Sequence, residues 1–238
     1  MLWYGPDMRS VLLACLLAAC GSCGDDGGSV DATPACTVSF DNGSCGDQLR
    51  FTGEYVDWDD DATFCGIFEA QFELAGGGMD STAPNGRFDL CIPGSANVDV
   101  TPSANMSQCT QPASTYARSA IAVANEEVQR CGAAWSGRNF TVAREASLGV
   151  TLDAAKAQVF VHIDQGSRTI ALAANHGATQ AVVDAAWAAG DTGHEVFFPN
   201  VDVGGGTTAL TITGGAALGA GDIPLVANKI TMVTVLAQ

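Results

Sequence analysis

The sequence predicts an all-β protein with two Greek-key-type β-sandwich domains, and three observations support this fold class. Short segments of alternating apolar and polar residues recur along the chain, as in strands with one buried and one solvated face. Turn-forming residues separate these segments, and the chain holds 28 glycines and 8 prolines. After residue 20 no apolar run reaches the ~18 residues that a membrane-spanning helix needs.

The period of two is clearest in the first half of the chain. Phe88, Leu90 and Ile92 fall on one side of a segment whose other side is polar or small. Pro84-Asn85-Gly86 precedes this segment and predicts a turn, because proline restricts φ and Asn-Gly tolerates positive φ. The other strands expected here are residues 49–58, residues 68–74 and a segment that includes Val98 and Val100.

The second half shows the same features. Gln165 to Arg168 predicts a hairpin-like turn, and Pro199 cannot donate to a strand ladder, so we place it at an edge or a bulge. Five or more strands at short spacing favour a second sandwich. The strands expected here are residues 158–164, 169–173, 195–203, 207–213 and 229–237.

The sequence leaves the secondary structure of two segments undecided. Residues 117–134 form either a helix or a loop that carries one strand, and residues 182–189 form either a helix or a strand. The resulting domain map has a first sandwich at residues 36–110, a connecting segment at 111–155 and a second sandwich at 156–238.

The amino terminus has the pattern of a secretory signal peptide. Residues 11–20 are apolar, Arg9 precedes them and small residues follow. Met8 is the more natural start, because the residues before it carry no positive charge. We expect residues 1–19 to be cleaved. Residues 20–35 are mainly Gly, Ser, Asp, Ala and Pro, so we expect a flexible tether.

The end of this signal, Leu17-Ala18-Ala19-Cys20, resembles the lipobox of bacterial lipoproteins. The resemblance implies cleavage before Cys20, acylation of Cys20 and a lipid bilayer as its partner. Three acyl chains would anchor the protein firmly, whereas one would not. Gly21 instead of aspartate after the cysteine implies the outer membrane of a Gram-negative bacterium, with the periplasmic or surface face left open.

A second resemblance covers much of the first expected sandwich. Gly53 to Asp57, Gly66 to Ala70 and Thr82 to Pro93 together resemble the carboxypeptidase regulatory-like domain, a small sandwich of the transthyretin-like type. Its most recognisable part is Gly86 to Pro93, where a turn glycine precedes Arg-Phe-x-Leu and a proline. The family is mostly non-catalytic, so the resemblance implies a spacer, scaffold or ligand-binding module.

The cysteines predict an oxidising compartment. The chain has nine, of which Cys15 leaves with the signal, Cys20 is committed to lipid and Cys23 lies in the tether. The remaining even set predicts three disulfides, although six cysteines allow 15 connectivities. We prefer sequential pairing: Cys36–Cys45, Cys65–Cys91 and Cys109–Cys131.

The net charge of −16 at pH 7 argues against nucleic acid as a partner. Most acidic residues precede residue 110, and Asp57, Asp59 and Asp61 alternate like the start of a calcium loop. An EF-hand would need glycine and glutamate where the chain has Ala62 and Phe68, so that motif is excluded. The expectation is no cofactor, with a looser Ca²⁺ loop at these aspartates as the one candidate.

Other candidate sites are weaker in the sequence. His162, His176 and His194 could hold a metal only if the fold brought them together. Trp58, Trp135 and Trp187 would stack on sugars if exposed, but tryptophans buried in a sandwich are more frequent. No hydrolase or dinucleotide motif is present, although a Ser/His/Asp site assembled from distant residues stays open.

These observations favour a lipid-anchored protein of the cell envelope that acts as a non-enzymatic binding or scaffold module. An envelope protein or a glycan is the expected partner, contacted through loops at the ends of the sandwiches. The alternative is a secreted hydrolase, or the accessory carbohydrate- or peptide-binding module of one.

Overall fold

The structure is a computed structural model that describes residues 41–58, 65–74, 78–102, 116, 118–146, 148–183 and 186–238. The expected signal peptide, the tether and Cys20 lie outside the described residues. Residues 34–238 belong to a single unit.

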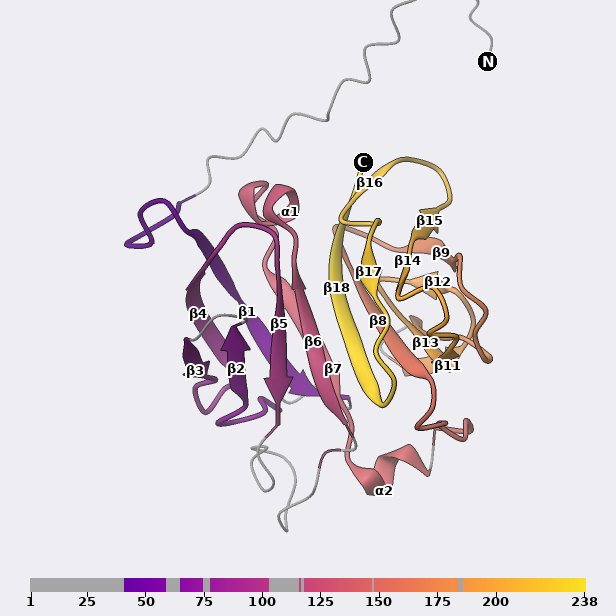
Figure 1. The fold of residues 1–238 in the computed structure, drawn as a ribbon. Coiled ribbons are helices and arrows are strands. Elements are labelled where there is room, and N and C mark those ends of the chain that lie inside the picture. The colour runs from indigo at the N-terminus through magenta and orange to yellow at the C-terminus, as the bar shows by residue number, and fades with distance from the viewer. Residues whose placement is uncertain are drawn as a thin grey trace, which may run out of the picture. The chain divides into compact units, whose positions relative to one another are not determined.

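The described part of the chain is mostly strand, which confirms the all-β fold class (Figure 1). The helices α1 (Glu126–Arg130) and α2 (Val142–Glu145) are short, and neither is long or apolar enough to cross a bilayer. The strands are β1 (Leu49–Asp57), β2 (Gln71–Leu74), β3 (Met79–Ser81), β4 (Arg87–Ile92), β5 (Ala96–Thr101), β6 (Ser119–Ala124), β7 (Trp135–Asn139), β8 (Ala157–Asp164), β9 (Arg168–Leu172), β10 (Gln180–Val183), β11 (Ala186–Ala189), β12 (Thr192–Gly193), β13 (Glu195–Val201), β14 (Thr207–Thr208), β15 (Leu210–Ile212), β16 (Ala217–Leu218), β17 (Ile223–Pro224) and β18 (Lys229–Ala237).

A ten-stranded sheet runs through the unit in the order β11-β10-β13-β8-β18-β6-β5-β2-β3, with β16 paired to β18. The last strand of the chain, β18, lies between β6 and β8 and is parallel to both. Its residues from Ile230 to Val235 are buried without a break. A strand covered on both faces has no solvent-exposed side, so its sequence is a nearly continuous apolar run.

The two faces of this central sheet pack against different layers, which Figure 1 shows on either side of β18. One face contributes Phe160, Ile230 and Met232 to a core shared with the sheet β4-β1-β7. The other contributes Val161, Val233 and further residues to a core shared with the sheets β12-β9-β15 and β14-β17. The described residues therefore form three layers of strands around two cores.

This arrangement corrects the expected division into two sandwiches with a connecting segment at residues 111–155. That segment contains β6, which belongs to the central sheet, and β7, which pairs in parallel with β1. The carboxyl-terminal strand β18 then joins β6 to β8. The expected boundary thus falls inside hydrogen-bonded sheets, because parallel pairing brings together strands that are far apart in the sequence.

Several local predictions are confirmed. Strand β4 alternates strictly between exposed and buried positions. The turn before it ends at Gly86, whose φ is +75°, and a Cβ atom there would lie 2.2 Å from the carbonyl oxygen of Tyr55. Pro199 lies at a register shift between β13 and β8, which is the predicted bulge. The strand expected at residues 68–74 begins only at Gln71, because Glu69 adopts a φ of +55°.

The open segments and one predicted turn resolve as follows. Residues 118–134 contain both β6 and α1, and the Asn125 side chain caps α1 by accepting from the backbone N–H of Val128 at 3.1 Å. Strands β10 and β11 pair as antiparallel neighbours, so residues 182–183 and 186–189 are strand rather than helix. The turn at Gln165 to Arg168 is present, but β8 and β9 belong to different sheets, so it is not a hairpin.

The disulfide between Cys45 and Cys91 overturns the preferred sequential pairing of both residues. It ties the loop before β1 to β4, and the neighbouring strands β1 and β4 pair from Leu49↔Ile92 onward. Cys65 and Cys131 are also disulfide-bonded. Cys36 and Cys109 lie outside the described residues. Spacing along the chain was a poor guide because antiparallel pairing, not proximity in sequence, sets which cysteines meet.

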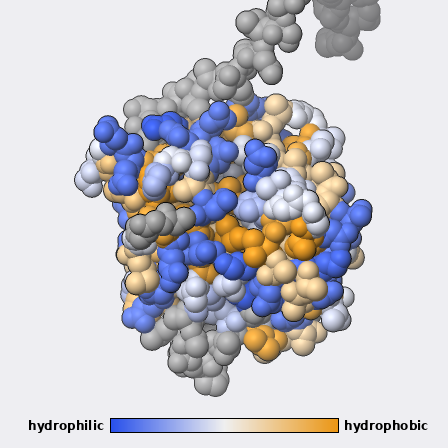
Figure 2. Space-filling model, viewed as in Figure 1, coloured by the Kyte–Doolittle hydropathy of each residue, from blue (hydrophilic) through white to orange (hydrophobic). Residues whose placement is uncertain are grey.

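The surface of the described residues is mixed. Figure 2 shows hydrophilic residues over much of one face, with a smaller group of hydrophobic residues near its centre. The large hydrophobic side chains that are most exposed are Met79, Val142, Val183 and Val226, which come from separate elements.

Candidate ligand-binding groove

A groove of about 550 Å³ lies on the outer face of the sheet β4-β1-β7, with β8 forming a wall. We call it the outer groove. Its lining combines five charged side chains, a histidine and two hydroxyls with a small apolar part. The lining residues are Arg50, Thr52, Gly53, Glu54, Arg87, Phe88, Asp89, Ala134, Trp135, Ser136, His162 and Asp164.

The alternation of β1 and β4 explains why this surface is polar. Phe51 and Tyr55 point into the aromatic core, so the intervening Arg50, Thr52 and Glu54 face outward. The register places Thr52 opposite Asp89 on β4. Gly53 allows β7 to lie close to β1, because a Cβ atom there would lie 2.1 Å from the carbonyl oxygen of Trp135. That close approach brings Ser136 into the groove.

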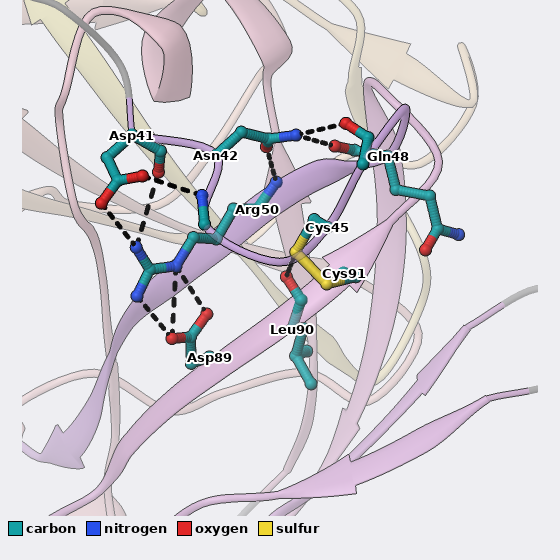
Figure 3. Close-up of a disulfide and its surroundings, with 10 residues drawn as sticks. Asp41, Asn42, Cys45, Gln48, Arg50, Asp89, Leu90 and Cys91 are labelled. Carbon is teal, nitrogen blue, oxygen red and sulfur yellow. Dashed lines mark hydrogen bonds and ion pairs between the residues drawn. A yellow bond between two sulfur atoms is a disulfide. The ribbon is translucent and has the colours of Figure 1, made fainter.

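Two of the lining residues, Arg50 and Asp89, form an ion pair, which Figure 3 shows beside the Cys45–Cys91 disulfide. Arg50 Nε donates to both carboxylate oxygens of Asp89 at 3.0 and 3.2 Å, and Nη2 donates to Oδ2 at 2.6 Å. The hydrogen bond from Arg50 lowers the pKa of Asp89 below its ordinary value. Asn42 holds the strand end by accepting from the backbone N–H of Arg50 at 2.9 Å. The charge of Arg50 is therefore already balanced.

At the wall formed by β8, three polar residues form a row across the central sheet. Glu195 on β13 is the register partner of His162 on β8, and His162 is the register partner of Thr234 on β18. Strand β7 lies over this row: the backbone N–H of Ser136 donates to Thr234 Oγ1 at 3.2 Å. Arg138, two residues further on, reaches the same row with its side chain.

Glu195 lies between two cationic or ionisable partners. Its Oε2 atom is 2.6 Å from Nε of Arg138, and its Oε1 atom is 3.5 Å from Nδ1 of His162. The Glu195 side chain is 2% exposed, whereas that of His162 is 22% exposed. Burial by itself raises the pKa of Glu195, but the interactions with His162 and Arg138 outweigh burial and lower it. Glu195 is therefore a buried carboxylate that stays ionised at neutral pH.

This geometry gives His162 two different environments. One ring nitrogen faces a buried carboxylate, and the residue also lines the groove. A carboxylate that holds one side of an imidazole sets the orientation of the ring. Among the described residues, His162 and Ser136 share the groove without a hydrogen bond between them. The site thus presents charged groups, hydroxyls and an imidazole to a ligand.

The predicted calcium loop is only partly described. Asp57 is buried at the end of β1 and its Oδ2 atom accepts a hydrogen bond from the Tyr116 hydroxyl at 3.0 Å. Asp59 and Asp61 lie outside the described residues. Within the ranges that the structure describes, no group of three or more His, Cys, Asp or Glu side chains could hold a metal ion.

The three histidines do not form a metal site. His162 lines the outer groove, and the carbonyl of His194 accepts from the backbone N–H of Ile163 at 2.8 Å. His176 packs its ring against Phe198, whose side chain belongs to the other core. Convergence on one metal is therefore wrong for these residues.

The tryptophans pack against other aromatic rings and do not form an exposed surface. Trp58 and Trp135 are fully buried, which confirms the buried alternative and excludes them as a platform for sugars. Trp187, on β11, stacks on Trp58 with ring centroids 3.8 Å apart, and its Nε1 donates to the Trp58 carbonyl at 3.2 Å. Their packing leaves the outer groove without a stacking tryptophan face.

Sequence reasoning missed Glu195 and Arg138. The available signal was a single acidic residue at the start of the apolar strand Val196-Phe197-Phe198, since a charge inside such a strand needs a partner. Finding that partner required the topology, because β7 meets β13 only through packing across the layers.

No protein-family model matches this chain, and no curated protein sequence matches it. Among solved structures, the Bacillus anthracis TIE protein is similar to it at 9% sequence identity with a TM-score of 0.21. The similarity covers 79% of this chain and 34% of that chain, so this chain spans about a third of that structure's length. A likeness this weak supports no argument about fold or function.

Proposed function

We propose that this chain is a non-enzymatic binding module of the bacterial cell envelope, anchored through acylated Cys20, with the outer groove as its contact surface. The observation that carries the proposal is the groove itself. It combines charged groups, hydroxyls and an imidazole in about 550 Å³ on a rigid sheet. A groove of this volume lies within the range of ligand sites in proteins, and its charged and hydroxyl groups suit a polar ligand such as a peptide or glycan segment.

The arrangement of the groove supports binding more than scaffolding alone. Its floor is built from paired strands, one of which is tied by the Cys45–Cys91 disulfide, so the polar groups keep their positions without a ligand. Fixed groups lose little entropy on binding, which favours affinity. The resemblance of Gly86 to Pro93 to the carboxypeptidase regulatory-like domain points the same way, because that family includes ligand-binding modules.

The anchor part of the proposal rests on Leu17 to Cys20 and is tested by partition into detergent. We expect the full chain, expressed in a Gram-negative bacterium, to enter the detergent phase and a Cys20→Ala variant to stay in the aqueous phase. A wild-type protein that stays soluble would contradict the anchor. So would a Cys20→Ala variant that still partitions.

The binding part is tested with arrays of short peptides and glycans. Thr52→Trp places a bulky ring in the groove, whereas Thr211→Trp places the same ring at an exposed position of β15 on another sheet. We expect ligands of the wild type to be lost with Thr52→Trp and kept with Thr211→Trp. Equal binding by both variants would exclude the outer groove as the contact surface.

A hydrolase is the second candidate, and the contact between His162 and Glu195 favours it. A carboxylate 3.5 Å from Nδ1 resembles the support of a general base, and Ser136 lines the same groove. The test measures turnover of ester, peptide and glycan substrates with each histidine replaced in turn. Turnover lost only with His162→Gln would support the hydrolase and overturn the non-enzymatic function.

A further inference from the structure

We propose that strand β11 pairs in antiparallel orientation with β11 of a second copy of this chain, so that the ten-stranded sheet continues from one molecule into its partner. This pairing is separate from the proposed binding function and does not involve the outer groove. Three features of β11 support it: a free hydrogen-bonding edge, a register in which two copies of that edge fit each other, and the absence of charge along it.

The ten-stranded sheet ends at β3 on one side and at β11 on the other. An edge strand carries a row of backbone N–H and C=O groups that no neighbour within the sheet uses, and this row is a template for another strand. The side chains along β11 are mostly small and open to solvent: Ala186, Ala188 and Ala189 are exposed, whereas Trp187 is half-buried. A second strand can therefore approach this edge closely.

The pairing of β10 with β11 shows which backbone groups of β11 point away from the sheet. The backbone N–H of Gly190, directly after β11, donates to the carbonyl of Thr179 at 3.0 Å, so these two residues form a hydrogen-bonded pair. Hydrogen-bonded and non-hydrogen-bonded pairs alternate along an antiparallel ladder, so the backbone of Ala188 is bonded to β10. The N–H and C=O groups of Trp187 and Ala189 consequently point outward from the sheet.

Two copies of this edge fit each other in one register. When the outward groups of both copies bond across the junction, Trp187 lies opposite the partner's Ala189, and Ala188 lies opposite its own copy on a two-fold axis. Such a contact is isologous, because the same surface serves both molecules. Ala188 then occupies a non-hydrogen-bonded position, where opposite Cα atoms are about 4.5 Å apart. Alanine is small enough for that position, and the large Trp187 ring meets a small residue.

Strand β11 is held in place before a second copy binds. Trp187 stacks on Trp58 with ring centroids 3.8 Å apart, and its Nε1 donates to the Trp58 carbonyl at 3.2 Å. All the residues of the strand also have register partners on β10. A strand that is already fixed loses little conformational entropy on binding, which favours the contact.

Charge distinguishes β11 from the other edge of the sheet. The described residues of β10 and β11 include no charged side chain, although the chain has a net charge of −16. At β3, the backbone N–H of Leu74 donates to the carbonyl of Gly78 at 3.1 Å. The same alternation therefore directs Met79 and Ser81 outward, and self-pairing would place Asp80 opposite the partner's Asp80. Like charges at opposite positions are destabilising, so β3 is protected from self-pairing and β11 is not.

The size of the contact sets its strength. Two short strands and the exposed apolar side chain of Val183 beside them bury less than the ~1,200 Å² of a stable interface. The dimer is therefore weak in dilute solution. It is favoured where copies are concentrated, as on a membrane that carries many anchored chains.

The register is tested by a cysteine on the two-fold axis. The full chain is purified in detergent as Ala188→Cys, in a Cys23→Ser background that removes the thiol of the expected tether, and is oxidised with copper phenanthroline. Opposite Cα atoms about 4.5 Å apart lie within the range of a disulfide. We expect non-reducing electrophoresis to show a covalent dimer that a reductant removes.

The matched control is Ala186→Cys in the same background. Ala186 is exposed on the same face of the same strand as Ala188. In the proposed register, however, the two copies of residue 186 are offset by four residues, or about 14 Å along the strands. We therefore expect little or no covalent dimer from this variant.

Sedimentation equilibrium tests the contact without a new disulfide. Between about 5 and about 500 µM we expect the weight-average mass of the wild type to rise toward that of a dimer. Ala188→Glu places like charges on the axis, as Asp80 does at β3, and should raise the dissociation constant roughly tenfold. Ala186→Glu, whose two copies lie apart, should change the dissociation constant much less.

The outcomes decide what occupies this edge. Equal crosslinking of the two folded cysteine variants, or a wild-type mass that stays that of a monomer at the highest concentration, would overturn the dimer. A dimer that Ala188→Glu leaves unchanged would overturn the pairing through β11. The same oxidation in intact cells would overturn the second copy if Ala188→Cys crosslinks only to a different protein, whose strand would then be the occupant.

Discussion

The two faces of the central sheet are covered in different ways. The face toward β4-β1-β7 packs a core rich in aromatic rings, among them Phe51, Tyr55, Trp135 and Phe160. The opposite face packs mainly Val, Ile, Leu and Ala, with Phe198 as its one aromatic member among the described residues. The described disulfide, Cys45–Cys91, ties the loop before β1 to β4 and so belongs to the aromatic side.

The difference shows two solutions to the same packing problem. Aromatic rings fill much of the space between the central sheet and the three-stranded sheet β4-β1-β7, and the Cys45–Cys91 disulfide crosslinks that small sheet at one end. Branched aliphatic residues fill the other core, where strands buried on both faces favour them. The polar row of Glu195, His162 and Thr234 lies on the aromatic side, where the small sheet stops and the groove begins.

The largest effect is expected from Trp135→Ala, which breaks the link between the layers. Trp135 contacts the rings of Phe51 and Phe88, and its Nε1 donates to the Met232 carbonyl on β18 at 3.3 Å. Removing a fully buried tryptophan costs about 4 kcal/mol. Urea denaturation followed by circular dichroism measures the loss, and a change below about 1 kcal/mol would contradict the packing described.

Glu195→Gln tests the buried ion pair, with an expected loss of about 3 kcal/mol at pH 7, because Arg138 stays buried with a neutral partner. The lowered pKa of Glu195 means that its stabilisation is present at neutral pH and is lost as the pH falls below the ordinary glutamate value. The variant should therefore lose less stability than the wild type between pH 6 and pH 3. An unchanged acid dependence would show that Glu195 is not the group concerned.

Replacing Cys45 and Cys91 together by alanine should cost about 2 kcal/mol, at the lower end for a disulfide, because Cys65 and Cys131 remain disulfide-bonded. The free energy of unfolding is compared under non-reducing conditions. A loss no larger than that of a surface substitution would mean that the disulfide does not hold the β1–β4 end.

The smallest effect is expected from Arg50→Gln. The ion pair with Asp89 is well formed but lies at the surface, where water and salt screen it. We expect the melting temperature to change little, and the change to shrink further in high salt. A large loss that salt does not reduce would assign Arg50 a buried structural role.

The sequence predicted the strands with a single buried face well. Strand β4, the turn at Gly86 and the bulge at Pro199 depend on local alternation and on backbone restrictions, which a sequence displays directly. The division into domains failed because β8 and β18 are buried on both faces. A continuous apolar segment in a sequence does not reveal whether its strand contributes to one core or lies between two cores.

The candidate site was less predictable for the same reason. His162 was a candidate only as a metal ligand, and its partner Glu195 was not recognised, because their contact depends on antiparallel pairing of β8 with β13. Arg138 reaches Glu195 through a third strand from another layer. For the tryptophans, burial in the core could be ranked above exposure as a sugar platform, since buried tryptophan is common. The sequence alone could not decide between the two.

One measurement tests the shared central sheet most directly: urea unfolding of Trp135→Ala followed by two probes. Tryptophan fluorescence reports on the aromatic side, and hydrogen exchange of the β9 and β15 amides reports on the aliphatic side, since Ile170 and Ile212 belong to that core. A sheet that serves both cores predicts that both probes lose stability by the same amount. Loss confined to the fluorescence signal, with the β9 and β15 amides protected as in the wild type, would contradict it.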